Sequence, residues 1–568
     1  MLNSIDKIGD WNPQLLRELK GRLKPFPVII AIVTSLATQL IIFLYQLREI
    51  PDLQSKNNID IEDKYCNLTN TVKDQYSSWI SCPPNQINMQ LWWQDHWEYM
   101  FRSLGMIFIF TLLMAGAYLI INDLSQEERK GTLNFIRLSP QSETSIFTGK
   151  MLGVPVLIYL TVFAAIPFHI LTGINGNLAF GNILCFYLIL VASCIFFYSY
   201  ALLFGVFGGS VLSGFKPWLG SGFVFLVLLF SMQLFSYGNS DDLVNCMGFA
   251  ALLSPTTIAD YFFPGFLSNQ TPALQELQFF NFAVGKSFIG VIALHLLNYA
   301  LWTYWAWQGL KRCFRNPNAT IFSKQQSYLI FASFQIVLIG LLVSIDYTNN
   351  DGIDWGSFSQ SVFALYMWNL LMIAPLFALM LTHRQAIQDW ARFRLYRNEN
   401  STANSNKSLL SELISGEKSP AILAFAINLL IAVSAVIILY FQVNIDSLHS
   451  TENFVKLNGA LLVAVSLIMI YATAAQIMLM LKNSKRVLWA AGTASALIIL
   501  PPLVLGVLNV DSHNMLWLFT ILFCPTAQYC TSPEIFTAFV CQVVIFGFLN
   551  WYLIKQVRKA GESATKAM

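Results

Sequence analysis

The sequence has few charged residues. Only 11% of its 568 residues are Asp, Glu, Lys or Arg, whereas 55% are hydrophobic. Ordinary soluble domains carry roughly a quarter charged residues, so this composition excludes a soluble globular protein. The sequence also lacks a basic face interleaved with aromatic residues, because its lysines and arginines cluster at the ends of apolar runs. Nucleic-acid binding is therefore excluded as well.

Motifs for nucleotide binding and for ion coupling are also missing. No Gly-x-x-x-x-Gly-Lys-Ser/Thr loop occurs, and the nearest string, Gly285-Lys286-Ser287, has Phe280 where the first glycine should be. No Asp or Glu lies near the centre of a long apolar run, which argues against coupling to protons or sodium. No Cys/His spacing typical of a metal site is found. We expect no enzymatic activity, cofactor or metal in this chain.

Long hydrophobic runs dominate what is present. A helix needs about 20 apolar residues to cross roughly 30 Å of hydrocarbon. Twelve runs meet this requirement: 27–47, 101–122, 151–173, 182–208, 219–237, 282–308, 327–345, 358–381, 421–441, 457–481, 487–508 and 535–554. The sequence predicts an all-α polytopic membrane protein with about twelve transmembrane helices.

The distribution of Lys and Arg predicts the orientation. Most of them fall in segments that lie on one side when both termini are cytoplasmic, which is the positive-inside pattern. The long loops 123–150 and 382–420 are then cytoplasmic, and we expect the protein in the cytoplasmic (inner) membrane. The polar, mixed-charge stretch 1–10 is not typical of a cleavable signal peptide, so the first span should be retained.

The two sets of six runs resemble a tandem repeat of one six-span unit. In each half, 1–316 and 317–568, the spans follow an Asn-Pro pair, Asn12-Pro13 and Asn316-Pro317, and the longest cytoplasmic loop lies between the second and third spans. Each also has a proline-broken apolar segment before its last span, at 253–261 and at 523–529. Repeated halves usually flank a central pathway. The alternative is that hairpins of spans resemble one another in any such protein.

An amphipathic segment precedes the first span. Within 11–24, Trp11 and four leucines share one helical face, while Arg17, Lys20 and Lys24 point elsewhere. This pattern predicts an elbow helix that lies flat on the membrane lipid of the inner leaflet.

The loop 123–150 contains a compact docking element. Ser125 and Glu128 have the spacing of a capping box, and Gly131 supplies a left-handed stop, which together predict a short helix. Leu133, Phe135, Ile136 and Leu138 then offer an apolar surface before Ser139-Pro140 restarts a helix through Lys150. The alternative is that any polytopic membrane protein needs capped loops.

The largest outer loop, 48–99, contains two cysteines. Cys66 and Cys82 could form a disulfide on an oxidising face, but their spacing alone does not establish proximity. The tryptophans near the end of this loop suit the membrane interface; they are Trp79, Trp92, Trp93 and Trp97.

Polar residues within the spans are sparse. We expect them to hydrogen-bond neighbouring helices rather than to contact substrate; they are Gln39, Gln233, His295, Asn298, Gln335, Asn369, Asn428 and Gln476. A pathway so poor in charge suits an amphipathic cargo better than an ion.

Acidic pairs in outer loops raise an enzyme alternative, since membrane glycosyltransferases use carboxylates at the outer face. The pairs are Asp241 with Asp242, Asp351 with Asp354, and Asp60 with Asp63. No convincing nucleophile or histidine accompanies them, so solvated loop charge is the preferred interpretation. A carrier that works without an ATPase is a further alternative.

The layout and the docking loop resemble the ABC-2 family of ATP-binding cassette transporter permeases. The six-span unit of that family carries a Glu-Arg-x-x-Gly-Thr-Leu-like coupling segment between spans two and three. Here the match is Glu128-Arg129-Lys130-Gly131-Thr132-Leu133, one residue shorter before the glycine, with Ser139-Pro140 where relatives often have Thr-Pro. The elbow helix and Ser254-Pro255 also fit, and the resemblance covers about 12–315 well.

The resemblance implies two fused six-span units moved by separately encoded cytoplasmic ABC ATPase subunits, which would bind the ATP. It implies coupling residues at Ser125, Glu128, Arg129, Gly131, Thr132 and Leu133, with Leu133 and Ile136 filling a groove on the ATPase. Family tendency favours export, and a homodimer formed through the first halves stays open. The substrate is not predicted.

The second half departs from the family pattern, because its loop lacks the Glu-Arg and Gly-Thr-Leu elements. A second, weaker coupling set is Arg384, Asp389, Arg392, Leu409 and Leu413. Leu409, Leu410, Leu413 and Ile414 are expected to form a substitute docking helix before Gly416. Alternatively, the second half is mainly structural.

Overall fold

The computed structural model is almost entirely helical. It describes residues 8–54, 58–67, 79–211, 216–237, 241–267, 273–316, 319–345, 347–349, 352–353, 355–380, 382, 384–400, 406–441, 451–483, 485–511, 514–521 and 530–562. In this part of the chain, 11 helices are long and apolar enough to cross a membrane. This confirms the predicted all-α polytopic membrane protein. The remaining expected span, 219–237, corresponds to α10, whose described apolar part Pro217–Gln233 is shorter than the others.

The chain divides into two compact units. The first comprises Met1–Asn239, Ala250–Glu276 and Gly285–Phe314, and the second comprises Ser240–Phe249, Leu277–Val284 and Arg315–Met568. The predicted repeat with a boundary at 316, and the cytoplasmic location of both termini, stay predictions.

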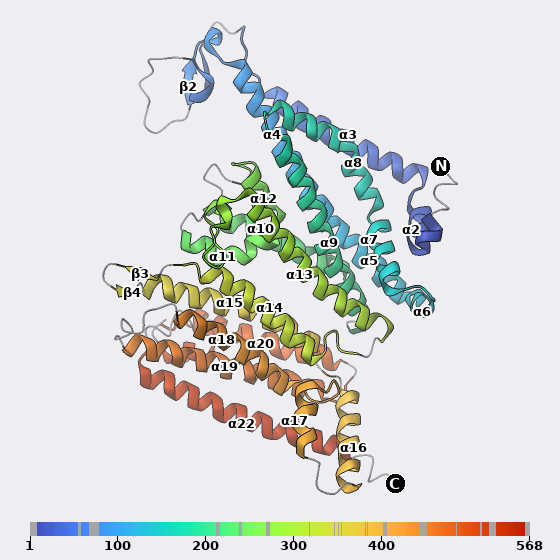
Figure 1. Cartoon of the computed structure of the whole chain (residues 1–568), viewed down its shortest axis with the longest axis vertical. Helices are drawn as coiled ribbons and strands as arrows, with labels where there is room; N and C mark the ends of the chain where they lie inside the picture. The colour runs from blue at the N-terminus through green and yellow to red at the C-terminus, as the bar shows by residue number, and fades with distance from the viewer. Residues whose placement is uncertain are drawn as a thin grey trace. The chain divides into compact units, whose positions relative to one another are not determined.

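The first unit contains the elbow helix and the first spans (Figure 1). Its helices are α2 (Pro13–Arg22), α3 (Pro25–Arg48), α4 (Met89–Phe110), α5 (Gly116–Arg129), α6 (Thr132–Leu138), α7 (Glu143–Gly153), α8 (Val156–Asn175), α9 (Phe180–Val211), α10 (Pro217–Tyr237), α12 (Pro255–Phe262) and α13 (Phe288–Arg315). The helix α11 (Asp241–Leu253) has residues in both units. The predicted elbow 11–24 is present as α2, and α3 packs along α8 (Figure 1).

One helix of this unit is unusually long. The helices α4 and α5 are joined without a break by a π-helical turn at Thr111–Ala115, giving a continuous helix Met89–Arg129 of 41 residues. The buried hydroxyl of Tyr198 donates a hydrogen bond of 2.7 Å to the carbonyl of Leu112 within this turn. Gly116 permits the approach, because a Cβ there would lie 2.1 Å from the Tyr198 hydroxyl oxygen. Such turns are typical of sites where a helix has to accommodate an inserted group.

A small disulfide-bonded hairpin precedes α4 and lies near the N-terminal end of that helix (Figure 1). The strands β1 (Ile59–Glu62) and β2 (Trp79–Cys82) pair antiparallel, with Ile59 opposite Cys82. A disulfide joins Cys66 to Cys82. The core of the hairpin includes Trp92, which is 2% exposed and stacks on His96. The hairpin therefore covers Trp92, and the interface location of the four tryptophans stays a prediction.

The proline-broken segment of the first unit is a helix pair, α11 and α12. The break at Ser254 and Pro255 leaves the last carbonyls of α11 without helical partners, which is costly away from water. Side chains of α13 supply the donors. Asn298 donates a 2.9 Å hydrogen bond to the Leu252 carbonyl, and Tyr299 donates one of 3.3 Å to the Leu253 carbonyl. The Nε2 of His295 lies 3.3 Å from the Ala251 carbonyl oxygen.

The second unit contains six of the long apolar helices together with the shorter helices α16 (Arg384–Asn400) and α17 (Asn406–Ser415). Its other elements are α14 (Lys324–Leu342), β3 (Thr348–Asn349), β4 (Gly352–Ile353), α15 (Trp355–Met380), α18 (Ile422–Tyr440), α19 (Thr451–Leu479), α20 (Arg486–Val507) and α22 (Ser532–Glu562). The helix α19 packs against α20 and α22, and α14 packs against α18. The segment 523–529 lies outside the described residues.

Most polar residues of the spans bond as expected. In addition to His295 and Asn298, Gln335 donates to Asn369, and Asn428 donates to Ser327. Gln39 differs, since it donates to Ser35 within its own helix. Gln476 is fully buried in α19, and its amide has no hydrogen-bond partner among the described residues.

We predict that Asn298→Leu destabilises the first unit. The change removes the donor to the Leu252 carbonyl and the acceptor of the 2.9 Å bond from Trp302. Leaving a buried carbonyl without its donor costs about 1–3 kcal/mol, so the thermal unfolding midpoint in maltoside micelles should fall. The control is Leu297→Ala on the exposed face of the same helix. An equal fall in both variants would contradict the role assigned to Asn298.

Candidate docking site

A buried lysine organises the base of the loop between α5 and α7. The side chain of Lys150 on α7 is only 1% exposed. Its Nζ lies 2.6 Å from Oδ2 of Asp123, 2.7 Å from Oε2 of Glu127 and 3.6 Å from Oε1 of Glu18. A buried charge is tolerated only when it is paired and hydrogen-bonded, and Lys150 meets this requirement.

Two arginines of the elbow helix complete the network. Arg22 contacts Asp123 at 2.6 Å and Glu18 at 3.3 Å, while Arg17 contacts Glu127 at 2.7 Å. Three carboxylates thus face three cations, and the group is formally neutral. We call these six residues the ion network: Arg17, Glu18, Arg22, Asp123, Glu127 and Lys150. It ties α2, α5 and α7 together.

The ion network keeps Lys150 charged. Burial alone would lower the pKa of Lys150, but Asp123, Glu127 and Glu18 outweigh this effect and hold the pKa above its ordinary value. The resulting contribution to stability is fully present below the pKa of an unfolded lysine. It is lost only as the pH rises through the higher folded pKa, so it is intact at neutral pH.

The three carboxylates also have the spacing of a cation site. Oxygen atoms of Glu18, Asp123 and Glu127 lie within 4.8 Å of one another. The ammonium of Lys150 already contacts all three. A metal ion would have to displace it, so the donor set fits the lysine rather than a metal.

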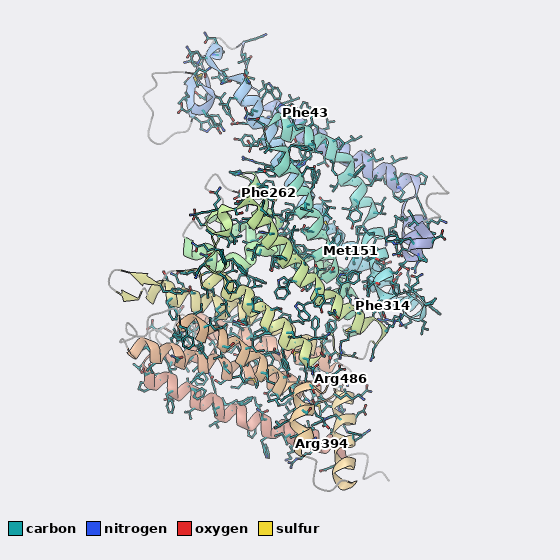
Figure 2. The ribbon with its side chains drawn as sticks, in the orientation of Figure 1. Phe43, Met151, Phe262, Phe314, Arg394 and Arg486 are labelled. Carbon is teal, nitrogen blue, oxygen red and sulfur yellow. A yellow bond between two sulfur atoms is a disulfide. The ribbon has the colours of Figure 1, made fainter. Side chains whose placement is uncertain are left out.

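Close backbone packing joins the elbow helix to α7. A Cβ at Gly149 would lie 2.8 Å from the backbone nitrogen of Leu15, and one at Gly153 would lie 2.5 Å from Cβ of Glu18. Asn12 caps α2 and donates a 2.8 Å hydrogen bond to the Ser145 carbonyl on α7. The other side of α7 is braced by Phe147, whose ring lies 4.9 Å from that of Phe314 (Figure 2).

The helix α6 projects from this base. It follows Gly131, which has a left-handed φ of 72°. Thr132 donates a 3.2 Å hydrogen bond to the Glu127 carbonyl, and Arg137 lies 3.5 Å from Glu128. Phe135 is 76% exposed and Leu138 is 84% exposed. Phe135 and Leu138 thus form an exposed apolar pair on a helix that is fixed at its base.

The structure corrects two details of the predicted docking element. Ser125 does not cap a separate helix, because α5 runs from the membrane to Arg129 and places Ser125 inside it. Glu128 accordingly pairs with Arg137 rather than with a capped backbone. The left-handed conformation of Gly131 is confirmed.

The second correction concerns the apolar face. Leu133 is 1% exposed and Ile136 is 8% exposed, so both pack inside the protein and the proposed groove contact through them is wrong. Phe135 and Leu138 face outward instead. Their spacing of three residues is the same as that of the buried pair, so the sequence marks two apolar faces without showing which one is covered. Arg129 at the end of α5 and Thr132 at the start of α6 are exposed.

The corresponding loop of the second unit forms a helix pair. The expected helix before Gly416 is α17, and Arg394 of α16 contacts its Glu412 at 3.1 Å (Figure 2). Lys324, buried at the start of α14, donates to the Leu413 carbonyl at 2.8 Å and to the Ser419 hydroxyl at 2.6 Å. Of the predicted coupling residues here, Asp389 and Arg392 are exposed, whereas Arg384, Leu409 and Leu413 are half-buried.

The acidic pairs of the enzyme alternative are not brought together with catalytic partners in the described part of the chain. Asp60 and Asp63 lie in and after β1 of the hairpin. Asp241 and Asp242 begin α11, but their side chains lie outside the described residues, as do Asp351 and Asp354.

Comparison of the chain with protein-family models, curated proteins and solved structures finds no match. The function is therefore inferred from the membrane fold, the ion network and α6.

We predict that Lys150→Met is strongly destabilising. It leaves three buried or partly buried carboxylates facing only two arginines, and breaking a buried ion pair from one side costs about 3–5 kcal/mol. Thermal unfolding in maltoside micelles at neutral pH would measure the loss.

The matched control is Lys130→Met, which removes an exposed lysine from the same loop. Surface substitutions usually change stability by less than about 0.5 kcal/mol. A Lys150→Met protein as stable as this control would show that the ion network does not hold the loop base together.

Proposed function

We propose that this chain is a membrane-spanning permease of the ABC-2 kind, moved by separately encoded cytoplasmic ATPase subunits that dock on α6. The multi-pass helical fold supports a transport role. The observation that carries the proposal is the exposed pair Phe135 and Leu138, held on a short helix above a buried ion network. The ATPases would bind and hydrolyse the nucleotide, so this chain needs no cofactor.

Docking of α6 is favoured by its apolar content. Burying a Phe or Leu side chain contributes about 1.5–3 kcal/mol, so a groove that covers both residues would add about 3–6 kcal/mol to docking. The exposed Arg129 and Lys130 lie just before the helix and offer positive charge to an acidic rim on the ATPase. Charges at a rim mainly guide association and orientation.

The base of α6 suits transmission of force. Lys150 bonds α7 to α5, and Arg17 and Arg22 bond α2 to the same carboxylates. A displacement of α6 would therefore reach the long helix Met89–Arg129 directly. We propose that this helix and the elbow helix move together when the ATPases close.

A second contact is proposed on the other unit, with different chemistry. Phe393 of α16 and Leu410 of α17 are each 60% exposed, and the Arg394 contact with Glu412 holds the two helices together. The two ATPase contacts would then be unequal, in keeping with the divergent second half. Export of an amphipathic cargo remains the proposed direction and substrate class.

We predict that Phe135→Glu abolishes ATPase docking without unfolding the permease. Docking would bury the Phe135 ring, so a charge in its place should weaken binding by at least about tenfold. The test places a photoreactive amino acid at position 138 of the full chain in native membranes and identifies the cross-linked protein by mass spectrometry. The expected product carries a nucleotide-binding subunit, and its yield falls in Phe135→Glu.

Thr144→Glu is the matched control. Thr144 is exposed in the first turn of α7, where an added carboxylate suits the helix N-terminus and lies off α6. Equal loss in both variants would mean that charge alone, not the apolar pair, controls docking. Cross-linking to lipid only, or transport by the purified chain alone in vesicles, would contradict the proposal and favour the ATPase-independent carrier.

A further inference from the structure

A hollow of about 540 Å³ lies beside α4 in the first unit. The hollow is open to its surroundings on one side. One face of α4 and the segment after α12 line it, through Tyr99, Arg102, Ser103, Met106, Gly265 and Phe266. The residues of α4 follow the helical spacing of three and four, so they form a single stripe.

The position of the hollow along α4 indicates its depth in the membrane. In the continuous helix Met89–Arg129, the ion network begins at Asp123. A hydrocarbon layer of about 30 Å corresponds to roughly 20 residues at 1.5 Å per residue, which leads from Asp123 back to Ser103. Arg102 therefore lies at the opposite membrane boundary, at the level of lipid head groups. Met106 lies one turn further into the hydrocarbon.

Three acceptors of the protein fix Arg102 in place. Its guanidinium donates to the Gly265 carbonyl at 3.0 Å and to the Pro264 carbonyl at 2.7 Å, and it pairs with Glu98. Gly265 has a φ of 90°, and a Cβ there would lie 2.8 Å from Nη1 of Arg102. The buried Nε of Arg102 has no hydrogen-bond partner among the described residues. The side chain as a whole remains 18% exposed, so part of it faces the hollow.

The surrounding charges decide which ligand fits. Lys64, which follows β1, contacts Asp95 of α4 at 2.9 Å, Glu62 at 3.1 Å and the Tyr99 hydroxyl at 3.2 Å. With Arg102 and Glu98, the neighbourhood holds two cations and three carboxylates. A purely anionic ligand would be repelled by this excess. A head group that carries both a phosphate and an ammonium matches both signs.

We propose that this hollow binds the head group of a zwitterionic phospholipid. The phosphate lies against Arg102 and accepts hydrogen bonds from the Tyr99 and Ser103 hydroxyls, since charge-assisted bonds from arginine are the strongest available there. The ammonium lies toward Glu98 and the aromatic rings. The acyl chains follow Met106 and Phe266 into the membrane. This inference does not depend on docking of an ATPase.

The test uses the full chain in maltoside micelles with a photoactivatable phosphatidylcholine at increasing mole fraction. We expect labelling of the peptide around 99–106 to saturate at a single lipid per chain, unlike the linear labelling of boundary lipid. Arg102→Gln and Ser103→Trp should each reduce the saturable labelling by about tenfold, the first by removing the cation and the second by filling the hollow. Ser103→Trp leaves the Arg102 contacts to Gly265 and Pro264 intact, so it keeps the test valid if Arg102→Gln unfolds.

Arg48→Gln is the matched control, because Arg48 is an exposed arginine at the end of α3 away from α2. Its labelling should equal that of the unchanged chain. Glu98→Gln tests the charge argument separately, since it should shift preference from phosphatidylcholine toward phosphatidylglycerol.

Competition identifies the ligand. Unlabelled phosphatidylcholine should displace the probe, whereas inorganic phosphate should not. Labelling that never saturates, or that is unchanged in both Arg102→Gln and Ser103→Trp, would overturn the site. Displacement by inorganic phosphate at equal concentration, or a preference of the unchanged chain for phosphatidylglycerol, would overturn the zwitterionic assignment.

Discussion

The arrangement of the first unit depends on the ammonium group of Lys150. It is surrounded by protein, and three carboxylates from two helices neutralise it. None of these carboxylates could be replaced by an apolar residue without leaving a cation with too few partners, and the same holds for Lys150 itself. The network therefore fixes α2, α5 and α7 in one register. The glycines of α7 allow the elbow helix to come close enough for this.

Within the membrane, the structure depends on satisfying the hydrogen bonds of the backbone. Every carbonyl that loses its helical partner must find another donor, because lipid offers none. The break between α11 and α12 meets this through Asn298 and Tyr299, and the π-helical turn has its Leu112 carbonyl bonded by Tyr198. These side chains are polar groups in apolar runs, yet they face the protein interior. Their hydrogen bonds to the irregular backbone are sufficient to explain why polar side chains occur there.

The spans could be predicted because each depends only on the length and composition of a continuous run. The left-handed Gly131 and the bonding of most polar residues in the spans were also predictable, since each follows from local rules. The ion network was not, because Glu18, Asp123 and Lys150 are far apart in the sequence and no periodicity links them. The burial of Leu133 and Ile136 also depends on tertiary packing. Two apolar pairs with equal spacing on one short helix are equivalent until a neighbour covers one of them.

The two apolar pairs of α6 have complementary mechanical consequences under the proposed function. Leu133 and Ile136 anchor the helix to the protein, while Phe135 and Leu138 receive the partner. A force on Phe135 passes through Thr132 to the backbone of Glu127, whose carboxylate contacts Lys150 and Arg17. Apolar contacts alone could slide, because they have no direction, whereas a buried ion pair has one favourable register. The first element to move would then be the 41-residue helix Met89–Arg129 as a body, with its π-helical turn as the one point along it where the regular hydrogen-bond pattern is already interrupted.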